Sequence, residues 1–227
     1  MDQVLLTRDS GENAAMARLL EARSIPYYSF PLLELKVRQF DWSSINSYCY
    51  LIITSKFAAQ IAARSLTSDF SLFVVGDESA NILRSNPKIT VVKVFKSSAE
   101  LCKDLKKNTN LLKFAYLSGS IIKRDIKEVD RYIIYDTVYA SKMSNELKQK
   151  IKNMEIRAIM LYSENCAKTF IDLCRQNDLC GYLKNIVAVV LSFNIKKMID
   201  KYIDKIFCSH PKPSNTLMLD LICKLYE

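Results

Sequence analysis

The sequence predicts an α/β fold with two similar parallel-sheet domains, joined by a two-stranded antiparallel hinge, with a cleft between them. Three observations lead to this prediction. Short apolar runs alternate with helical segments along most of the chain, which is typical of parallel sheets covered by helices. Two strand–helix units recur in the same order. A segment rich in aromatic and β-branched residues, 131–141 (RYIIYDTVYAS), reads as a long strand between the two halves.

The opening residues predict strand, helix and strand. Residues 4–7 are apolar, residues 8–11 turn the chain, and helical spacing follows to Leu20. Pro26 and Pro31 then bracket an extended segment, because proline disfavours helix at and before its own position. This opening is too small to fold alone, so we expect it to join the C-terminal part of the chain.

The same alternation predicts the remaining elements. In the middle of the chain we expect a short segment around Trp42, strands at 49–54, 72–75, 90–95 and 113–117, and helices at 55–62, 78–84, 98–107 and from the turn at 118–120 to about Val129. Beyond residue 141 we expect helices at 145–152, 164–175, 193–202 and 216–226, and strands at 156–162, 186–191 and 205–208.

A weak internal repeat supports two similar domains. LIITSKFAAQIAA at 51–63 is similar to IMLYSENCAKTFI at 159–171, and 72–83 is similar to 187–198. The alternative is that any two strand–helix units look alike, because their physics is shared. We predict a discontinuous domain of 1–35 plus 139–227, an inserted domain of 38–134, and hinge strands at about 29–37 and 131–141.

Composition limits the class of protein. The 227 residues are 49% apolar and 25% charged, and no apolar run approaches the ~18 residues of a membrane helix. The seven cysteines form no C-x-x-C pair and the start lacks a secretory signal, so we expect reduced thiols and a cytoplasmic location. The single histidine, His210, reads as a surface loop residue, and no metal site is expected.

The formal net charge of +9 points to an anionic partner or to a basic surface kept for solubility. Nucleic acid and a small polyanion fit the charge equally well. Aromatic residues do not alternate with basic residues on any element, so a nucleic-acid platform is poorly supported. The four glycines lie far apart and form no dinucleotide or P-loop motif. We therefore expect no nucleic-acid partner, no membrane association and no cofactor.

Small hydroxyl residues or glycines repeatedly follow a strand and precede a helix. In a parallel sheet these turns share the carboxyl edge, where ligands bind and helix N-termini favour anions. The alternative is that serine and threonine there only cap helices. Basic residues near the turns, Arg8, Lys56 and Arg124, could add charge-assisted contacts. The predicted substrate-binding residues are Arg8, Thr54, Ser55, Gly76, Ser79, Gly119, Ser163 and Ser192.

Several stretches carry a family resemblance, in order and over nearly the whole chain. They are 4–35, 51–63, FVVGDESANIL at 73–83, IIYDTVYAS at 133–141, 159–171 and 210–222. On these the chain resembles the uroporphyrinogen-III synthase family. The resemblance implies two α/β domains joined by a two-stranded ladder, with the middle domain inserted. It implies a lyase of tetrapyrrole (heme) biosynthesis that cyclises and dehydrates hydroxymethylbilane, a linear tetrapyrrole with eight carboxylates, with inversion of ring D.

The resemblance also implies roles for particular residues. Tyr135 matches the family's site tyrosine, with Tyr139 as runner-up, and a phenol with a pKa of ~10 can donate a proton at neutral pH without carrying charge. Ser79 matches a threonine of the family, and Ser55 and Ser163 match its strand-end serines. The alternative to a catalytic role is that Tyr135 only packs the hinge. The resemblance implies no metal and no cofactor, and we expect a monomer with transient contact to the preceding pathway enzyme.

One departure from the family keeps a second function open. The family commonly has a glycine, one variable residue and paired threonines where this chain has Leu191, Ser192, Phe193 and Asn194. The alternative is therefore a non-catalytic two-domain binding module for an anionic small molecule.

Overall fold

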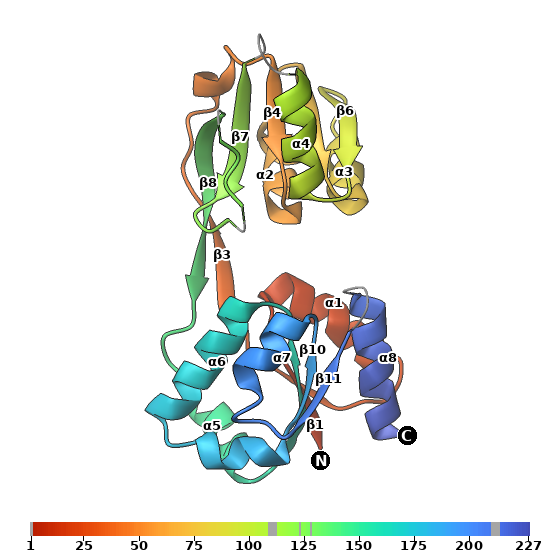
Figure 1. Ribbon diagram of the computed structural model, residues 1–227, viewed down its shortest axis with the longest axis vertical. Helices are drawn as coiled ribbons and strands as arrows, with labels where there is room; N and C mark the ends of the chain where they lie inside the picture. Colours follow the sequence, from red (N-terminus) through yellow and green to blue (C-terminus); the bar gives the residue numbers. More distant parts are fainter. Residues whose placement is uncertain (1, 109–112, 123, 128, 210–213) are drawn as a thin grey trace. The chain divides into compact units, whose positions relative to one another are not determined.

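A computed structural model describes residues 2–108, 113–122, 124–127, 129–209 and 214–227 of the chain (Figure 1). His210 lies outside this described part. The chain divides into two compact units. Unit 1 contains residues 1–34 and 138–227, and unit 2 contains residues 35–137. The chain therefore passes between the units twice.

Unit 1 is built on a five-stranded parallel sheet with the order β11-β10-β9-β1-β2. The strands are β1 (Gln3–Leu6), β2 (Tyr27–Ser29), β9 (Ile156–Leu161), β10 (Val187–Val190) and β11 (Lys205–Cys208). The three central strands are almost continuously apolar and buried, as expected for a sheet covered on both faces.

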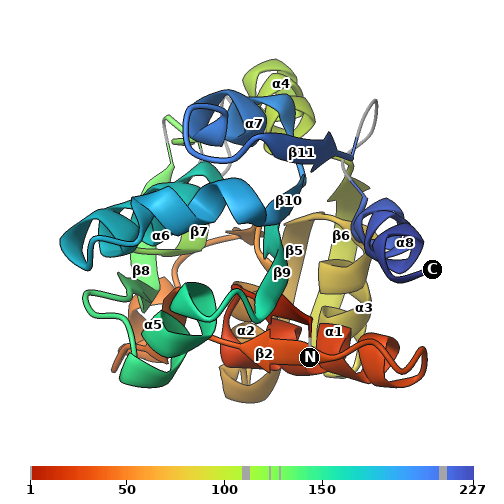
Figure 2. The same cartoon turned by 90° about the horizontal axis from the view of Figure 1, so that it is seen from below.

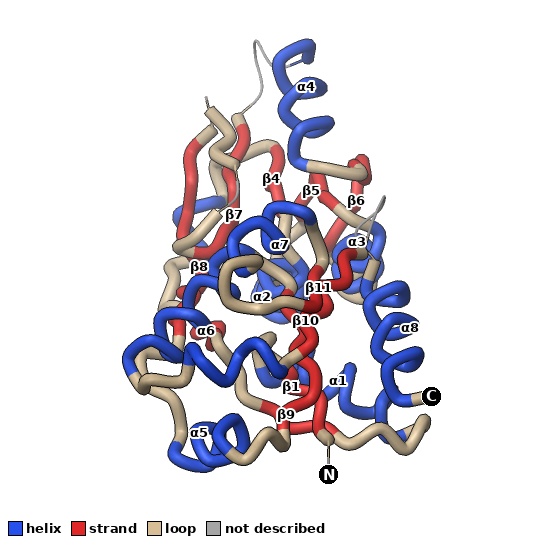
Figure 3. Tube along the Cα trace, turned by 60° about the horizontal axis from the view of Figure 1, so that its bottom comes forward, coloured by secondary structure: helices blue, strands red, loops and turns tan. Residues whose placement is uncertain are grey.

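Helices cover both faces of this sheet (Figures 2 and 3). One face carries α5 (Asn145–Lys152), α6 (Glu164–Gln176) and α7 (Phe193–Ile199), and the other carries α1 (Ser10–Glu21) and α8 (Asn215–Tyr226). A 3₁₀ segment, η2 (Cys180–Asn185), lies on the first face. The alternation of side chains along β1 explains the two cores, because Leu5 packs with α6 while Val4 and Leu6 pack with α1.

Unit 2 is built on a sheet with the order β3-β8-β7-β4-β5-β6. The strands are β3 (Leu33–Val37), β4 (Tyr50–Ile53), β5 (Phe70–Val75), β6 (Ile89–Phe95), β7 (Phe114–Gly119) and β8 (Asp130–Tyr139). The pairs from β8 to β6 are parallel. β3 runs antiparallel to β8, because Leu32 bonds with Ala140 at one end while Arg38 bonds with Ile134 at the other.

The helices of unit 2 also lie on both faces of its sheet. α4 (Ser98–Asn108) covers one face, and α2 (Lys56–Ser65) and α3 (Asp77–Arg84) cover the other (Figure 1). The short segment expected around Trp42 is a 3₁₀ turn, η1 (Trp42–Ile45). The predicted α/β class with parallel sheets is confirmed. No helix in the described ranges is long and apolar enough to cross a membrane.

Two predicted elements are wrong. The expected helix from the turn at 118–120 to about Val129 is not formed by the described residues of that segment. The carbonyls of Gly119 and Ser120, which would be among its first acceptors, instead accept hydrogen bonds from Arg131. The expected single strand at 29–37 is divided into β2 and β3, because Pro31 has no N–H to continue a ladder.

Candidate active site

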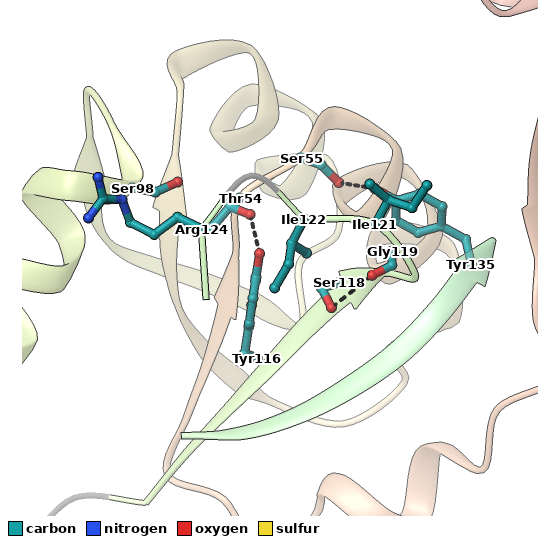
Figure 4. A pocket seen from close by; sticks show the side chains of 10 residues that line it. All are labelled: Thr54, Ser55, Ser98, Tyr116, Ser118, Gly119, Ile121, Ile122, Arg124 and Tyr135. Carbon is teal, nitrogen blue, oxygen red and sulfur yellow. Dashed lines mark hydrogen bonds between the residues drawn. The ribbon is translucent and has the colours of Figure 1, made fainter. Parts of the chain in front are cut away.

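A pocket of about 230 Å³ lies in unit 2 at the carboxyl ends of β4 and β7, beside the middle of β8 (Figure 4). Parallel sheets bind ligands at this edge. The lining is mixed, with hydroxyl, aromatic and aliphatic side chains and one arginine. The lining residues are Thr54, Ser55, Ser98, Tyr116, Ser118, Gly119, Ile121, Ile122, Arg124 and Tyr135.

Tyr135 lies over the backbone of Gly119. The two residues are partners in the parallel ladder of β7 and β8, where a bulge shifts the register between Ser118 and Gly119. A Cβ atom on Gly119 would stand 2.4 Å from Tyr135 Cζ and 2.8 Å from its hydroxyl oxygen. Only a residue without a side chain leaves room for the ring there, so the glycine determines where the phenol lies.

The hydroxyl of Tyr135 is paired with that of Ser55. The two oxygens lie 3.1 Å apart, and Ser55 Oγ also accepts a hydrogen bond of 3.1 Å from Ala58 N–H as the N-cap of α2. The ring of Phe57 meets the Tyr135 ring edge-on, with centroids 5.0 Å apart. Tyr135 is 7% exposed, its ring is held on two sides, and its oxygen borders the pocket beside the positive end of α2.

Arg131 fixes the bulge that carries this arrangement. Its guanidinium donates to Ser118 Oγ at 2.8 Å, to the Gly119 carbonyl at 2.6 Å and to the Ser120 carbonyl at 3.1 Å. Ser120 in turn donates its N–H to the Tyr135 carbonyl at 2.9 Å. The turn after β7 is therefore tied to β8 from both sides.

A second tyrosine, Tyr116, reaches the same pocket from the middle of β7. Its hydroxyl lies 2.7 Å from Thr54 Oγ1 (Figure 4). The side chain is buried, and burial raises the pKa of the Tyr116 phenol, with an opposing contribution from the hydrogen bond of Thr54. The group is therefore neutral at physiological pH.

The structure brings four of the predicted site residues together and leaves two others of unit 2 apart. Thr54, Ser55, Gly119 and Tyr135 line the pocket, whereas Gly76 and Ser79 are not among the lining residues. Gly76 has a φ of 89° at the N-cap of α3, a conformation that favours glycine. Ser79 is buried in the first turn of α3.

One charge at the start of α2 is paired with one in the first turn of α3. Lys56, a basic residue expected to help bind an anion, forms an ion pair with Glu78. Glu78 is one of the two acidic residues, Asp77 and Glu78, that directly follow Gly76, a predicted substrate-binding residue.

The remaining predicted residues belong to unit 1. Arg8 follows β1 and forms an ion pair of 2.9 Å with Glu12, with its guanidinium 4.9 Å from the centre of the Tyr162 ring. Ser163 caps α6, because its Oγ accepts from Cys166 N–H at 3.2 Å. Ser192 stands at the N-cap of α7 without a side-chain cap bond.

The runner-up, Tyr139, also packs in unit 1, against the core that α5, α6 and α7 share. It is not among the residues that line the pocket. Of the two candidate phenols, Tyr135 is therefore the one beside the serine and glycine of the strand ends.

The sequence prediction missed Tyr116, Arg131 and Ser98. Tyr116 reads as one more residue of an apolar strand, although the hydroxyl of a buried tyrosine usually has a partner and could have indicated a polar neighbour. Arg131 gives no local signal, because its role depends on a turn twelve residues earlier. No group of three or more histidine, cysteine or acidic residues able to hold a metal occurs among the described residues.

Comparison with known proteins identifies the family. The family model of uroporphyrinogen-III synthase HemD matches residues 14–219. An uncharacterized protein of Rickettsia prowazekii (strain Madrid E) is 26% identical, and the alignment covers 100% of this chain and 98% of that protein.

Solved structures share the fold. The uroporphyrinogen-III synthetase of Helicobacter pylori 26695 superposes with a TM-score of 0.63 at 14% identity, covering 99% of this chain and 100% of the other. A mutant uroporphyrinogen III synthase of the bacterium Thermus thermophilus superposes with a TM-score of 0.59 at 12% identity, covering 100% of both chains. Since the family model spans most of the sequence and the fold agrees, this chain belongs to the uroporphyrinogen-III synthase family.

Proposed function

We propose that this protein is an active uroporphyrinogen-III synthase, which cyclises and dehydrates hydroxymethylbilane with inversion of ring D. The match of the family model to residues 14–219 carries the proposal. The pocket at the carboxyl edge of the unit 2 sheet supports it, because a buried phenol, Tyr135, borders a cavity of mixed polarity there.

The reaction needs one proton at its start and releases one at its end. A proton transferred to the terminal hydroxyl lets the C–O bond break, so that water leaves and an azafulvene cation remains. Ring D then attacks through its substituted α-carbon and forms a spiro intermediate. That intermediate breaks its bond to the ring C bridge and recloses at the other α-carbon of ring D, which loses its proton. The sum is hydroxymethylbilane to uroporphyrinogen III and water.

We assign the first proton to Tyr135. Ser55 Oγ accepts from Ala58 N–H, so its own hydrogen is available for the Tyr135 oxygen. In that arrangement the Tyr135 hydrogen points to the pocket and can be donated to the leaving hydroxyl. Ser55 would then stabilise the phenolate, and the proton released from ring D would restore the phenol. No charged acid is required at neutral pH.

The size of the pocket suits one part of the substrate. At about 230 Å³ it is smaller than the roughly 300–1,000 Å³ typical of sites for drug-sized ligands. We infer that the pocket holds one terminal ring with its side arms and that the rest of the tetrapyrrole extends beyond it. A monomeric state, a cytoplasmic location and transient contact with the preceding pathway enzyme stay predictions from the sequence.

A product assay tests the proposal directly. Hydroxymethylbilane cyclises spontaneously to the type I isomer, so the isomer ratio reports the action of the protein. The purified protein is incubated with hydroxymethylbilane, and the products are oxidised and separated. We expect the type III isomer to predominate.

The same assay separates this proposal from a non-catalytic binding module. Only type I product from a folded protein would exclude the synthase activity. Tight binding of the linear tetrapyrrole without turnover would then favour the binding module.

A further inference from the structure

The pocket extends over both faces of the unit 2 sheet. Side chains alternate along a strand, so neighbouring residues of β4 and β7 point to opposite faces. Tyr116 belongs to the core under α4, together with Ile52. Tyr135 belongs to the core under α2 and α3, together with Ile53. The two phenols thus approach the carboxyl edge from opposite faces, and both border the same cavity.

Each phenol has its own hydroxyl partner at the end of β4. Thr54 and Ser55 are consecutive, and Thr54 pairs with Tyr116 at 2.7 Å while Ser55 pairs with Tyr135 at 3.1 Å (Figure 4). Two hydroxyls joined by one hydrogen bond leave one hydrogen unused, whichever of them donates. The Tyr116–Thr54 pair therefore always offers one donor hydrogen.

Around this pair, the guanidinium groups of Arg124 and Arg131 favour a negatively charged oxygen, and the carboxylate of Asp125 opposes it. Arg124 lines the same pocket, and its side chain extends toward Ser98 at the start of α4 (Figure 4). Burial raises the pKa of the Tyr116 phenol, so the pair carries no charge that would repel an anion. Ser118 is engaged by Arg131 and does not join this group.

We propose that Tyr116 and Thr54 form a carboxylate-binding subsite, which holds an acetate or propionate arm of the terminal ring while Tyr135 faces its reacting end. This inference rests on the proposed function for the identity of the substrate. The subsite orients the ring across the sheet edge, with recognition on the α4 face and proton transfer on the other face. Tyr116 thereby acts in binding, and Tyr135 acts in the chemical step.

Kinetic constants distinguish the two roles. The test measures KM and kcat for hydroxymethylbilane with Tyr116→Phe, Thr54→Val and the double variant. Loss of a hydrogen bond to a charged group predicts a KM raised about 10- to 100-fold with little change in kcat. The double variant should lose less than the product of the single effects, because the pair acts as one donor. Tyr50→Phe, whose ring packs against Phe73 and Phe114 outside the lining, is the matched control and should keep wild-type constants.

A binding measurement tests the subsite without turnover. The probe is porphobilinogen, a single pyrrole with one acetate and one propionate arm, titrated into the full-length protein and followed by NMR. We expect wild-type protein and Tyr135→Phe to bind it, and Tyr116→Phe and Thr54→Val to bind at least about 10-fold more weakly. Equal binding by all variants, or no binding by wild type, would overturn the inference.

The two proposals can fail separately. If the protein forms the type III isomer but Tyr116→Phe keeps the wild-type KM, the subsite is wrong and the synthase proposal stands. If a folded protein forms only type I, the synthase proposal is wrong, and the porphobilinogen titration still decides whether the pair binds carboxylates.

Discussion

The ring of Tyr135 occupies the space that a side chain at Gly119 would fill. A Cβ at Gly119 would stand 2.4 to 2.5 Å from two ring carbons of Tyr135, whereas carbon atoms in contact lie ~3.5–4.0 Å apart. Gly119 does not have a positive φ, so its backbone conformation is open to other residues. Glycine is needed at this position only because a side chain would overlap the Tyr135 ring. The position of the phenol therefore depends on Gly119.

Gly119→Ala should therefore displace Tyr135 and reduce activity. We expect a large fall in the fraction of type III isomer, measured by product separation. Overpacking should also lower the free energy of unfolding by about 1–3 kcal/mol in denaturant titrations. Gly181→Ala is the control, because a Cβ there meets no atom within 4 Å, and it should change neither quantity. Wild-type product from Gly119→Ala would mean that the phenol is not required in this position.

Much of the fold was predictable because local patterns agree with the tertiary structure. Short, mostly apolar runs followed by serine caps predicted β4 with α2 and β9 with α6. The predictions fail where contacts between residues far apart in the sequence determine the local structure. The bonds from Arg131 to the carbonyls at 119 and 120 replace a predicted helix, and no local signal reveals them.

The candidate site was predictable in part for the same reason. Each of Thr54, Ser55 and Gly119 could be predicted from its own position at the end of a strand. The parallel sheet then brings the three residues together. Their grouping around Tyr135 required the bulge in β7 and β8, which shifts the register by one residue. Tyr116 was missed because its ring packs in the core, so the residue looks like one more apolar position of the strand. In our proposal only its hydroxyl oxygen acts on the substrate. The roles assigned to these residues stay predictions.

Tyr135→Phe isolates the phenolic oxygen and keeps the ring. We expect kcat to fall by roughly 10²- to 10⁴-fold, the usual contribution of a positioned acid, with KM nearly unchanged. The measurement is initial rate against hydroxymethylbilane concentration. Ser55→Ala should lower kcat less and should also cost about 1 kcal/mol of stability, because it removes the cap of α2. Undiminished kcat in Tyr135→Phe would remove this residue from the chemical step.

Tyr162 should titrate late in alkali. Burial raises the pKa of its phenol to about 12, against an opposing contribution from Arg8. A raised pKa favours the neutral form in the folded state, so its stabilisation is complete below pH ~10 and is lost as the pH rises toward about 12.

Phenolate absorbance measures this directly, as the difference between wild type and Tyr162→Phe across the alkaline range. Arg8→Gln should move the transition to still higher pH, because it removes a positive charge beside the ring. A Tyr162 transition near pH 10 would contradict the burial seen in the structure.

Ser163 and Ser192 provide a matched test of capping against substrate binding. Ser163 Oγ accepts from Cys166 N–H, whereas Ser192 makes no side-chain cap bond. Ser163→Ala should lower the free energy of unfolding by about 1 kcal/mol, and Ser192→Ala by a few tenths at most. Denaturant titration gives both values. A raised KM with unchanged stability in Ser192→Ala would identify that serine as a substrate contact, and equal destabilisation by both variants would contradict the capping difference.

Arg131 should act on the chemistry through Gly119 and Tyr135. Arg131→Lys keeps the positive charge and loses the planar fork that reaches Ser118 Oγ and two carbonyls. We expect about 1–3 kcal/mol of lost stability, a lower kcat with KM less affected, and a changed tyrosine signal in near-ultraviolet circular dichroism as the ring loses its fixed position. Arg84→Lys is the control in the same unit, since Arg84 is exposed and its guanidinium bonds to the side chain of Asn81 on its own helix. If Arg131→Lys lost stability but kept kcat and the tyrosine signal, the guanidinium would support the fold without positioning Tyr135.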